Sequence, residues 1–220
     1  MAESARRPER NETYRVGGVA AIVSLLAGLG TAAVSGNLPL WVMQPSEMPQ
    51  ARVEFLRDLS QHAPAALRFF GADFIFIITY VIVFATLYEV TAGRSRTIAL
   101  IAIWAGVLGA LCDLLENASF ITYAWGSMRG ADFIEPALPL AYYVTNFKES
   151  LLGIGIVMFG AIFPRRTALE WTLSTLMILG APLDALAIAY PNLKQLPTLL
   201  FVVALPLMSI YFLSRFGHAE

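Results

Sequence analysis

The sequence predicts an all-α fold, a polytopic membrane helical bundle with six transmembrane helices and both termini in the cytoplasm. Its 220 residues are 57% hydrophobic and only 14% charged, with a mean hydropathy of +0.64, which is unusual for a soluble domain. Apolar runs recur along the chain, and each is long enough to cross a bilayer as a helix of about 20 residues. Arginines also gather in alternate connections between these runs, as the positive-inside rule describes.

The predicted spans follow one another as a single domain; no internal repeat is clear in the sequence, and a three-plus-three arrangement of the spans stays open. Turn and charge signals separate several of them, at 92–96, 163–166 and 190–192. Residues 1–15 are predicted to form a polar cytoplasmic tail, and residues 215–220 a second short one. Between the tails lies one transmembrane domain, 16–214, whose six spans are 16–36, 68–90, 97–124, 138–163, 169–190 and 196–214.

The distribution of basic residues predicts the orientation of these spans. If the N-terminus is cytoplasmic, nine basic residues lie inside and five lie outside. This excess on the inner side favours cytoplasmic termini, and we expect a multi-pass protein of the plasma (inner) membrane. The inside set is Arg6, Arg7, Arg10, Arg15, Arg94, Arg96, Arg165, Arg166 and Arg215, and the outside set is Arg52, Arg57, Arg68, Arg129 and Lys194.

The first outer connection, residues 37–67, is long enough to contain structure of its own. The stretch PQARVEFLRDLSQ places Val53, Leu56 and Leu59 on one side of a helix. This pattern is typical of a short helix that lies in the membrane interface. Such a helix would either cover the mouth of a site or serve as a plain surface connector.

The stretch LCDLLENASF, residues 111–120, places polar side chains inside a predicted span. Asp113, Glu116, Asn117 and Phe120 are spaced i, i+3, i+4 and i+7, so they share one face of a helix. A carboxylate that faces lipid costs at least a few kcal/mol, so this face is predicted to point into the bundle.

Three other spans contribute ionisable or amide side chains, and the predicted topology gives them a common depth. Asp73 lies about five residues, or ~8 Å, inside the outer edge of its span. Lys148, Glu149 and Asn146 lie in the outer half of the fourth span, and Asp184 lies in the outer half of the fifth. We therefore predict one polar cluster in the outer half of the bundle.

The charges of this cluster cannot all be present in a dry site. Five acidic residues face one certain base, Lys148, and both burial and like charge disfavour ionised carboxylates. We expect either Asp113 or Glu116 to pair with Lys148. At least one other carboxyl group should be protonated or exposed to water near neutral pH.

Several kinds of chemistry lack the residues they need. The two histidines, His62 and His218, lie outside the spans, which disfavours haem, metal ligation by histidine and Ser-His catalysis. The single cysteine, Cys112, cannot form a disulfide within the chain. The net charge of −1 offers no basic surface for nucleic acid. We predict no cofactor and no metal, and the sequence identifies no protein partner.

Three functions remain open. The first is binding, or transport, of a small molecule or lipid, with membrane lipids around the protein and Lys148 holding an anionic or polar head group. The second is an intramembrane acid–base enzyme, such as an isomerase of a lipid or isoprenoid, with Phe120, Tyr142 and Tyr143 stabilising positive charge. The third is a structural or assembly subunit in which the cluster only joins helices. The residues predicted to be catalytic are Asp113, Glu116 and Lys148, and those predicted to bind ligand are Asp73, Tyr80, Asn117, Tyr142, Asn146, Glu149 and Asp184.

Overall fold

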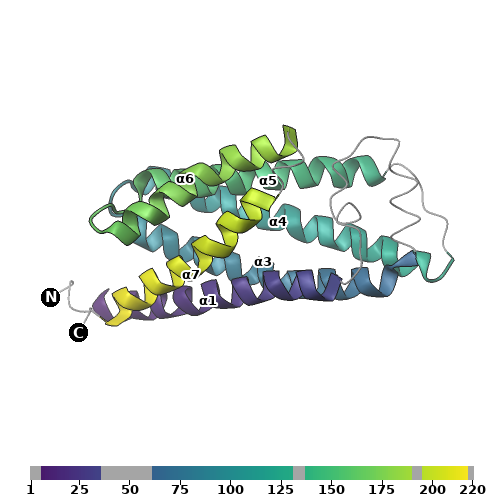
Figure 1. Ribbon diagram of the computed structural model, residues 1–220, viewed down its shortest axis with the longest axis horizontal. Helices are drawn as coiled ribbons and strands as arrows, with labels where there is room; N and C mark the ends of the chain where they lie inside the picture. The colour runs from purple at the N-terminus through teal and green to yellow at the C-terminus, as the bar shows by residue number, and fades with distance from the viewer. Residues whose placement is uncertain (1–5, 36–60, 131–136, 190–194, 218–220) are drawn as a thin grey trace.

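The computed structural model describes residues 6–35, 61–130, 137–189 and 195–217. This part of the chain consists of six α-helices and contains no strand (Figure 1), so the all-α prediction is confirmed. The helices are α1 (Arg6–Ser35), α3 (Ala63–Thr91), α4 (Arg96–Ser127), α5 (Ala137–Ile162), α6 (Ala168–Ala189) and α7 (Gln195–Gly217).

The observed helices coincide with the six predicted spans but extend beyond some of them. α1 begins at Arg6 rather than at residue 16, so most of the predicted polar tail is helical, and Glu12 pairs with Arg15 one turn away at 2.9 Å. α3 begins at Ala63 rather than at residue 68, with a proline in its first turn, where a missing N–H is tolerated. The interfacial helix predicted within 37–67 falls almost entirely on residues 36–60, which lie outside the described residues.

The helices form a closed ring in chain order. α1 packs on α3, and each later helix packs on the one before it, while α7 returns to pack on α1. Consecutive helices run antiparallel, so the start of α1 and the end of α7 lie at the same end of the bundle (Figure 1). At this end Arg94, after α3, donates a hydrogen bond of 3.1 Å to the carbonyl of Phe163, after α5.

Small residues allow the helices to approach closely. The ring of Phe84 on α3 fills the space where a side chain at Gly106 on α4 would stand, and a Cβ at Gly155 on α5 would lie 2.9 Å from the Ala102 carbonyl of α4. A buried hydrogen bond of 2.7 Å from Ser24 to Thr79 joins α1 to α3. Close contact at small residues is typical of helix packing within membranes.

Two apolar clusters fill the interior. The larger one occupies the half of the bundle near the chain ends and includes the fully buried rings of Phe159, Phe163 and Phe212. The smaller one joins the start of α3 to the end of α4, where Phe70 stacks on Phe120 with a centroid distance of 5.2 Å. The polar face of α4 lies between these two clusters.

Large apolar side chains cover the outside of the bundle. Leu26, Ile78, Trp104 and Leu115, on three different helices, are each at least 60% exposed. Within the described residues four helical segments are long and apolar enough to cross a membrane, namely Asn11–Thr31, Ala63–Thr91, Arg96–Ser127 and Leu199–Phe216. A monomeric soluble protein rarely exposes so much contiguous apolar surface.

Candidate functional site

The stretch LCDLLENASF lies in the second half of α4 and turns its polar face inward, as the spacing predicts. Asp113, Glu116 and Asn117 are each 5% exposed or less, and Phe120 is fully buried. On the opposite face Leu111 and Leu115 are exposed. The periodicity of the helix therefore sorts polar side chains to the inside and apolar ones to the outside, the reverse of a soluble helix.

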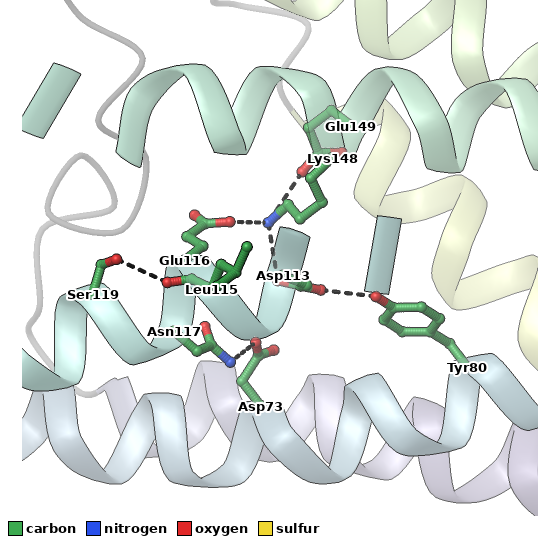
Figure 2. Close-up of polar contacts among 9 residues, drawn as sticks. All are labelled: Asp73, Tyr80, Asp113, Leu115, Glu116, Asn117, Ser119, Lys148 and Glu149. Atoms are coloured by element: carbon green, nitrogen blue, oxygen red, sulfur yellow. Dashed lines mark hydrogen bonds and ion pairs between the residues drawn. The ribbon is translucent and has the colours of Figure 1, made fainter. Parts of the chain in front are cut away.

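Lys148 reaches from α5 to the acidic face of α4. Its Nζ lies 2.5 Å from Glu116 Oε2 and 3.2 Å from Asp113 Oδ1, and Glu149 Oε1 is 3.6 Å away. Figure 2 shows the ammonium group between these carboxylates. We expected either Asp113 or Glu116 to pair with Lys148, whereas the structure pairs both, because one helical turn places the two carboxylates on the same side.

Two polar side chains of α3 complete the arrangement from the other side. Tyr80 donates a hydrogen bond of 3.1 Å to Asp113 Oδ2, so Asp113 accepts from both α3 and α5. Asp73, two turns before Tyr80, accepts a hydrogen bond of 2.8 Å from Asn117 Nδ2. These contacts join three helices (Figure 2). We call the group the cavity cluster, and its members are Asp73, Tyr80, Asp113, Glu116, Asn117, Lys148 and Glu149.

A cavity of about 450 Å³ adjoins the cavity cluster. This volume falls within the range of about 300–1,000 Å³ that small-molecule sites occupy. All seven members of the cluster line the cavity, whereas its other walls are mainly apolar and come from α3, α5, α6 and α7. The aromatic part of the wall consists of Phe69, Phe70, Phe76, Phe84 and Phe201.

The remaining predicted site residues do not all reach this cavity. Asn146 is half-buried and is not among the residues that line it. Phe120 is fully buried against Phe70, and Tyr143 is 68% exposed, so neither takes the position proposed for stabilising positive charge. The side chains of Tyr142 and Asp184 lie outside the part of the chain that the structure describes.

A second polar group lies at the end of the bundle where α1 begins and α7 ends. We call it the arginine cluster, made of Arg165, Thr167, Glu170, Ser174 and Arg215. The fully buried Glu170 accepts hydrogen bonds from the backbone N–H groups of residues 166 and 167 and pairs with Arg215 at 2.5 Å. Arg165 donates to Ser174 at 2.8 Å. The sequence analysis did not select this group, although Thr167-Ala-Leu-Glu170 has the spacing of a capping box.

Sequence reasoning also missed the apolar walls of the cavity. Met177, Gly180 and Ala181 of α6 and Phe201 and Leu205 of α7 line it. Apolar residues in a membrane-type helix carry no signal that separates those facing a cavity from those facing lipid. Their place in the cavity wall becomes evident only when the six helices are arranged in their closed ring.

Comparison of the chain with protein-family models, with curated proteins and with solved structures finds no match in any of the three. Within the described residues, no group of three or more histidine, cysteine, aspartate or glutamate side chains could hold a metal ion.

Proposed function

We propose that this chain is a multi-pass protein of the plasma membrane, with six spans and cytoplasmic termini, that binds a small amphiphilic molecule or lipid. The apolar exterior supports the membrane location. α5 and α6 contain 26 and 22 residues, which suffices for a crossing of about 20 residues. Exposed tryptophans at opposite ends of the helices, Trp125 beside Arg129 and Trp171 beside Arg165, resemble the aromatic belts of membrane proteins.

Cysteine labelling tests the orientation. In a Cys112→Ala background, Gly93→Cys places a thiol between α3 and α4, and Met128→Cys places one after α4. Both positions are exposed. An impermeant maleimide added to intact cells should label the Met128→Cys variant but not the Gly93→Cys variant. The Gly93→Cys variant should be labelled once the membrane has been permeabilised. Labelling of Gly93→Cys in intact cells would contradict the proposed topology.

The observation that carries the binding proposal is the cavity beside the cavity cluster. Polar groups that only join helices are expected to be closely packed and satisfied by each other. Here the polar group forms one wall of a space of about 450 Å³ whose other walls are apolar. A concave, mainly apolar pocket with a few convergent polar groups is the usual form of a small-molecule site.

Binding fits the interior better than transport does. A transporter needs a polar path to each side of the membrane in turn, around a site near its middle. In this bundle the half near the chain termini is filled by Phe159, Phe163, Leu173 and Phe212, all fully buried. The proposed ligand would therefore enter and leave from one side.

A cavity-filling variant tests the binding proposal. Apart from the neighbouring residues and backbone of its own helix, no heavy atom of the described chain lies within 4 Å of the point where a Cβ on Gly180 would stand, and Gly180 lines the cavity. Gly180→Leu should therefore take up part of the cavity. Gly71→Leu is the matched control, because Gly71 is equally open but does not line the cavity.

The readout is native mass spectrometry of each purified protein after incubation with a lipid extract of the producing membranes. We expect the unaltered protein and Gly71→Leu to carry a bound small molecule of defined mass. Gly180→Leu should retain about tenfold less of it, because lost pocket volume removes apolar contacts and adds clashes. An absence of any bound molecule, or equal binding by both leucine variants, would contradict the proposal. A molecule that the protein changes chemically would instead establish the acid–base enzyme.

A further inference from the structure

The contacts of Lys148 determine which head group the cavity can accept. This inference rests on the proposed function and names its ligand class. The ammonium group donates to Glu116 and Asp113, and Glu149 occupies a third direction at 3.6 Å. An anionic head group would have to displace carboxylates that already hold Lys148. The expectation that Lys148 receives an anionic head is therefore not supported by this geometry.

The balance of acidic and basic groups in the cavity wall favours a cationic head group instead. Four carboxylates line the cavity, from Asp73, Asp113, Glu116 and Glu149, and they face one ammonium group. Three of the four lie within 3.6 Å of Lys148. Asp73 has no ion pair among the described residues, and its hydrogen-bond partner is the neutral amide of Asn117. The wall thus carries more acidic groups than basic ones, and Asp73 is the acidic group that lacks an ion pair among the described residues.

The walls around Asp73 suit an organic cation rather than a metal ion. Phe69, Phe70 and Phe76 precede or follow Asp73 on α3 within one turn and line the same cavity, and Phe201 contacts Phe76 edge to face at 5.3 Å. Aromatic faces attract organic ammonium groups, and the volume accommodates a small apolar body. A hard metal ion would require several oxygen ligands in one place.

We propose that the cavity binds a single-chain amphiphile with a cationic ammonium head, and that the Asp73 carboxylate receives this head while the chain lies along the apolar walls. A zwitterionic phospholipid also carries an ammonium group. Its phosphate, however, would lie close to the same carboxylates, where like charges repel. The free amine is therefore the ligand class that the charge distribution selects.

The test compares amphiphiles that share one chain and differ in the head. Dodecylamine, dodecanol and dodecanoate provide a cationic, a neutral and an anionic head near neutral pH, because an alkyl ammonium group loses its proton only near pH ~10. Dissociation constants are measured by native mass spectrometry of the purified protein in a nonionic detergent. Dodecylamine should bind about tenfold or more tightly than dodecanol, because its head forms a charge-assisted hydrogen bond.

Asp73→Asn identifies the receiving group. Its amide oxygen can still accept from Asn117, so the contact between α3 and α4 is kept. This variant should lose about tenfold in dodecylamine affinity and keep its dodecanol affinity, because only the charge is removed. Glu89→Gln is the matched control, since it removes one exposed carboxylate from the same helix and does not touch the cavity. It should leave both affinities unchanged.

The outcomes separate this inference from the function on which it rests. If none of the three amphiphiles binds, the proposed binding function fails as well. If dodecanol or dodecanoate binds as tightly as dodecylamine, the cavity binds amphiphiles and only the cationic preference is wrong. Competition of dodecylamine by phosphatidylethanolamine would assign the ammonium group to a phospholipid and overturn the free-amine proposal. The head-group comparison uses the unaltered protein, so it stands even if Asp73→Asn fails to fold.

Discussion

The two polar clusters of this bundle bury similar groups in different surroundings. In the arginine cluster Glu170 faces one partner arginine and two backbone N–H groups, and Arg215 is 41% exposed. In the cavity cluster Asp113 and Glu116 share one lysine whose side chain is 13% exposed. The arginine cluster gives its single carboxylate an arginine partner and caps a helix, whereas the cavity cluster has more carboxyl groups than cations and lines a cavity.

This difference separates a structural polar contact from a candidate site. Polar groups that satisfy each other's charges and hydrogen bonds have no interaction left to offer a ligand, however deeply they are buried. An excess of one charge beside an unfilled apolar space has no structural use, because burying unpaired charge opposes folding. The comparison therefore directs attention to the cavity cluster, and three substitutions test how far it holds.

Lys148→Met should have the largest effect on stability. It leaves Asp113 and Glu116 buried side by side without their shared cation. Loss of one partner of a buried ion pair costs about 3–5 kcal/mol, and we expect a loss of this size in the free energy of unfolding, measured by denaturant titration in detergent. A triple variant that adds Asp113→Asn and Glu116→Gln should recover most of it, since no charge is then left unpaired. A stable Lys148→Met variant would show that the carboxylates do not depend on Lys148.

Glu170→Gln should have a smaller effect, of about 1 kcal/mol. The glutamine oxygen can still accept from the backbone N–H groups of residues 166 and 167, and the half-exposed Arg215 can turn to water. The same unfolding titration measures the loss. Amphiphile binding should be unchanged, because the arginine cluster shares no residue with the cavity wall. A tenfold loss of binding in this variant would contradict the separation of the two clusters.

Ser24→Ala should have the smallest effect. It removes the buried hydrogen bond from α1 to Thr79 on α3 without unpairing any charge. Interhelical hydrogen bonds of this kind contribute about 0.6 kcal/mol on average in membrane proteins, and Thr79 keeps its bonds to the carbonyls of residues 75 and 76. Thermal unfolding of the two proteins side by side measures the difference. If Ser24→Ala lost as much stability as Lys148→Met, buried hydrogen bonds and buried ion pairs would contribute equally, which would contradict the comparison of the two clusters.

Much of the fold could be predicted from the sequence because helices in a membrane-type protein are dictated locally. Apolar runs predicted each of the six helices, and the arginine and proline signals at 92–96 and 163–166 lie where α3 gives way to α4 and α5 to α6. The start of α1 at Arg6 could not be predicted from hydropathy. That first turn is polar, and its helical form reflects continuity with the apolar helix that follows and pairs such as Glu12–Arg15.

The polar half of the candidate site was predictable for a related reason. Charged residues are so costly inside such helices that Asp113, Glu116 and Lys148 stand out, and the helical period places Asp113 and Glu116 on one face of α4. The cavity itself was not predictable. Its walls are apolar residues of α6 and α7 such as Met177 and Leu205, and their placement around the same cavity as the polar face of α4 follows from closure of the whole ring. Likewise, the helical period of α4 does not predict that the Phe120 ring packs against Phe70 rather than lining the cavity.

The central claim is that the cavity cluster receives a cationic head at Asp73, and locating that head tests it most directly. The measurement is an experimental structure of the protein saturated with dodecylamine. We predict density for the chain within the cavity and an amine nitrogen within about 4 Å of an Asp73 carboxylate oxygen. An amine bound outside the cavity, or a chain in the cavity with its nitrogen directed away from Asp73 toward α6 and α7, would contradict the account.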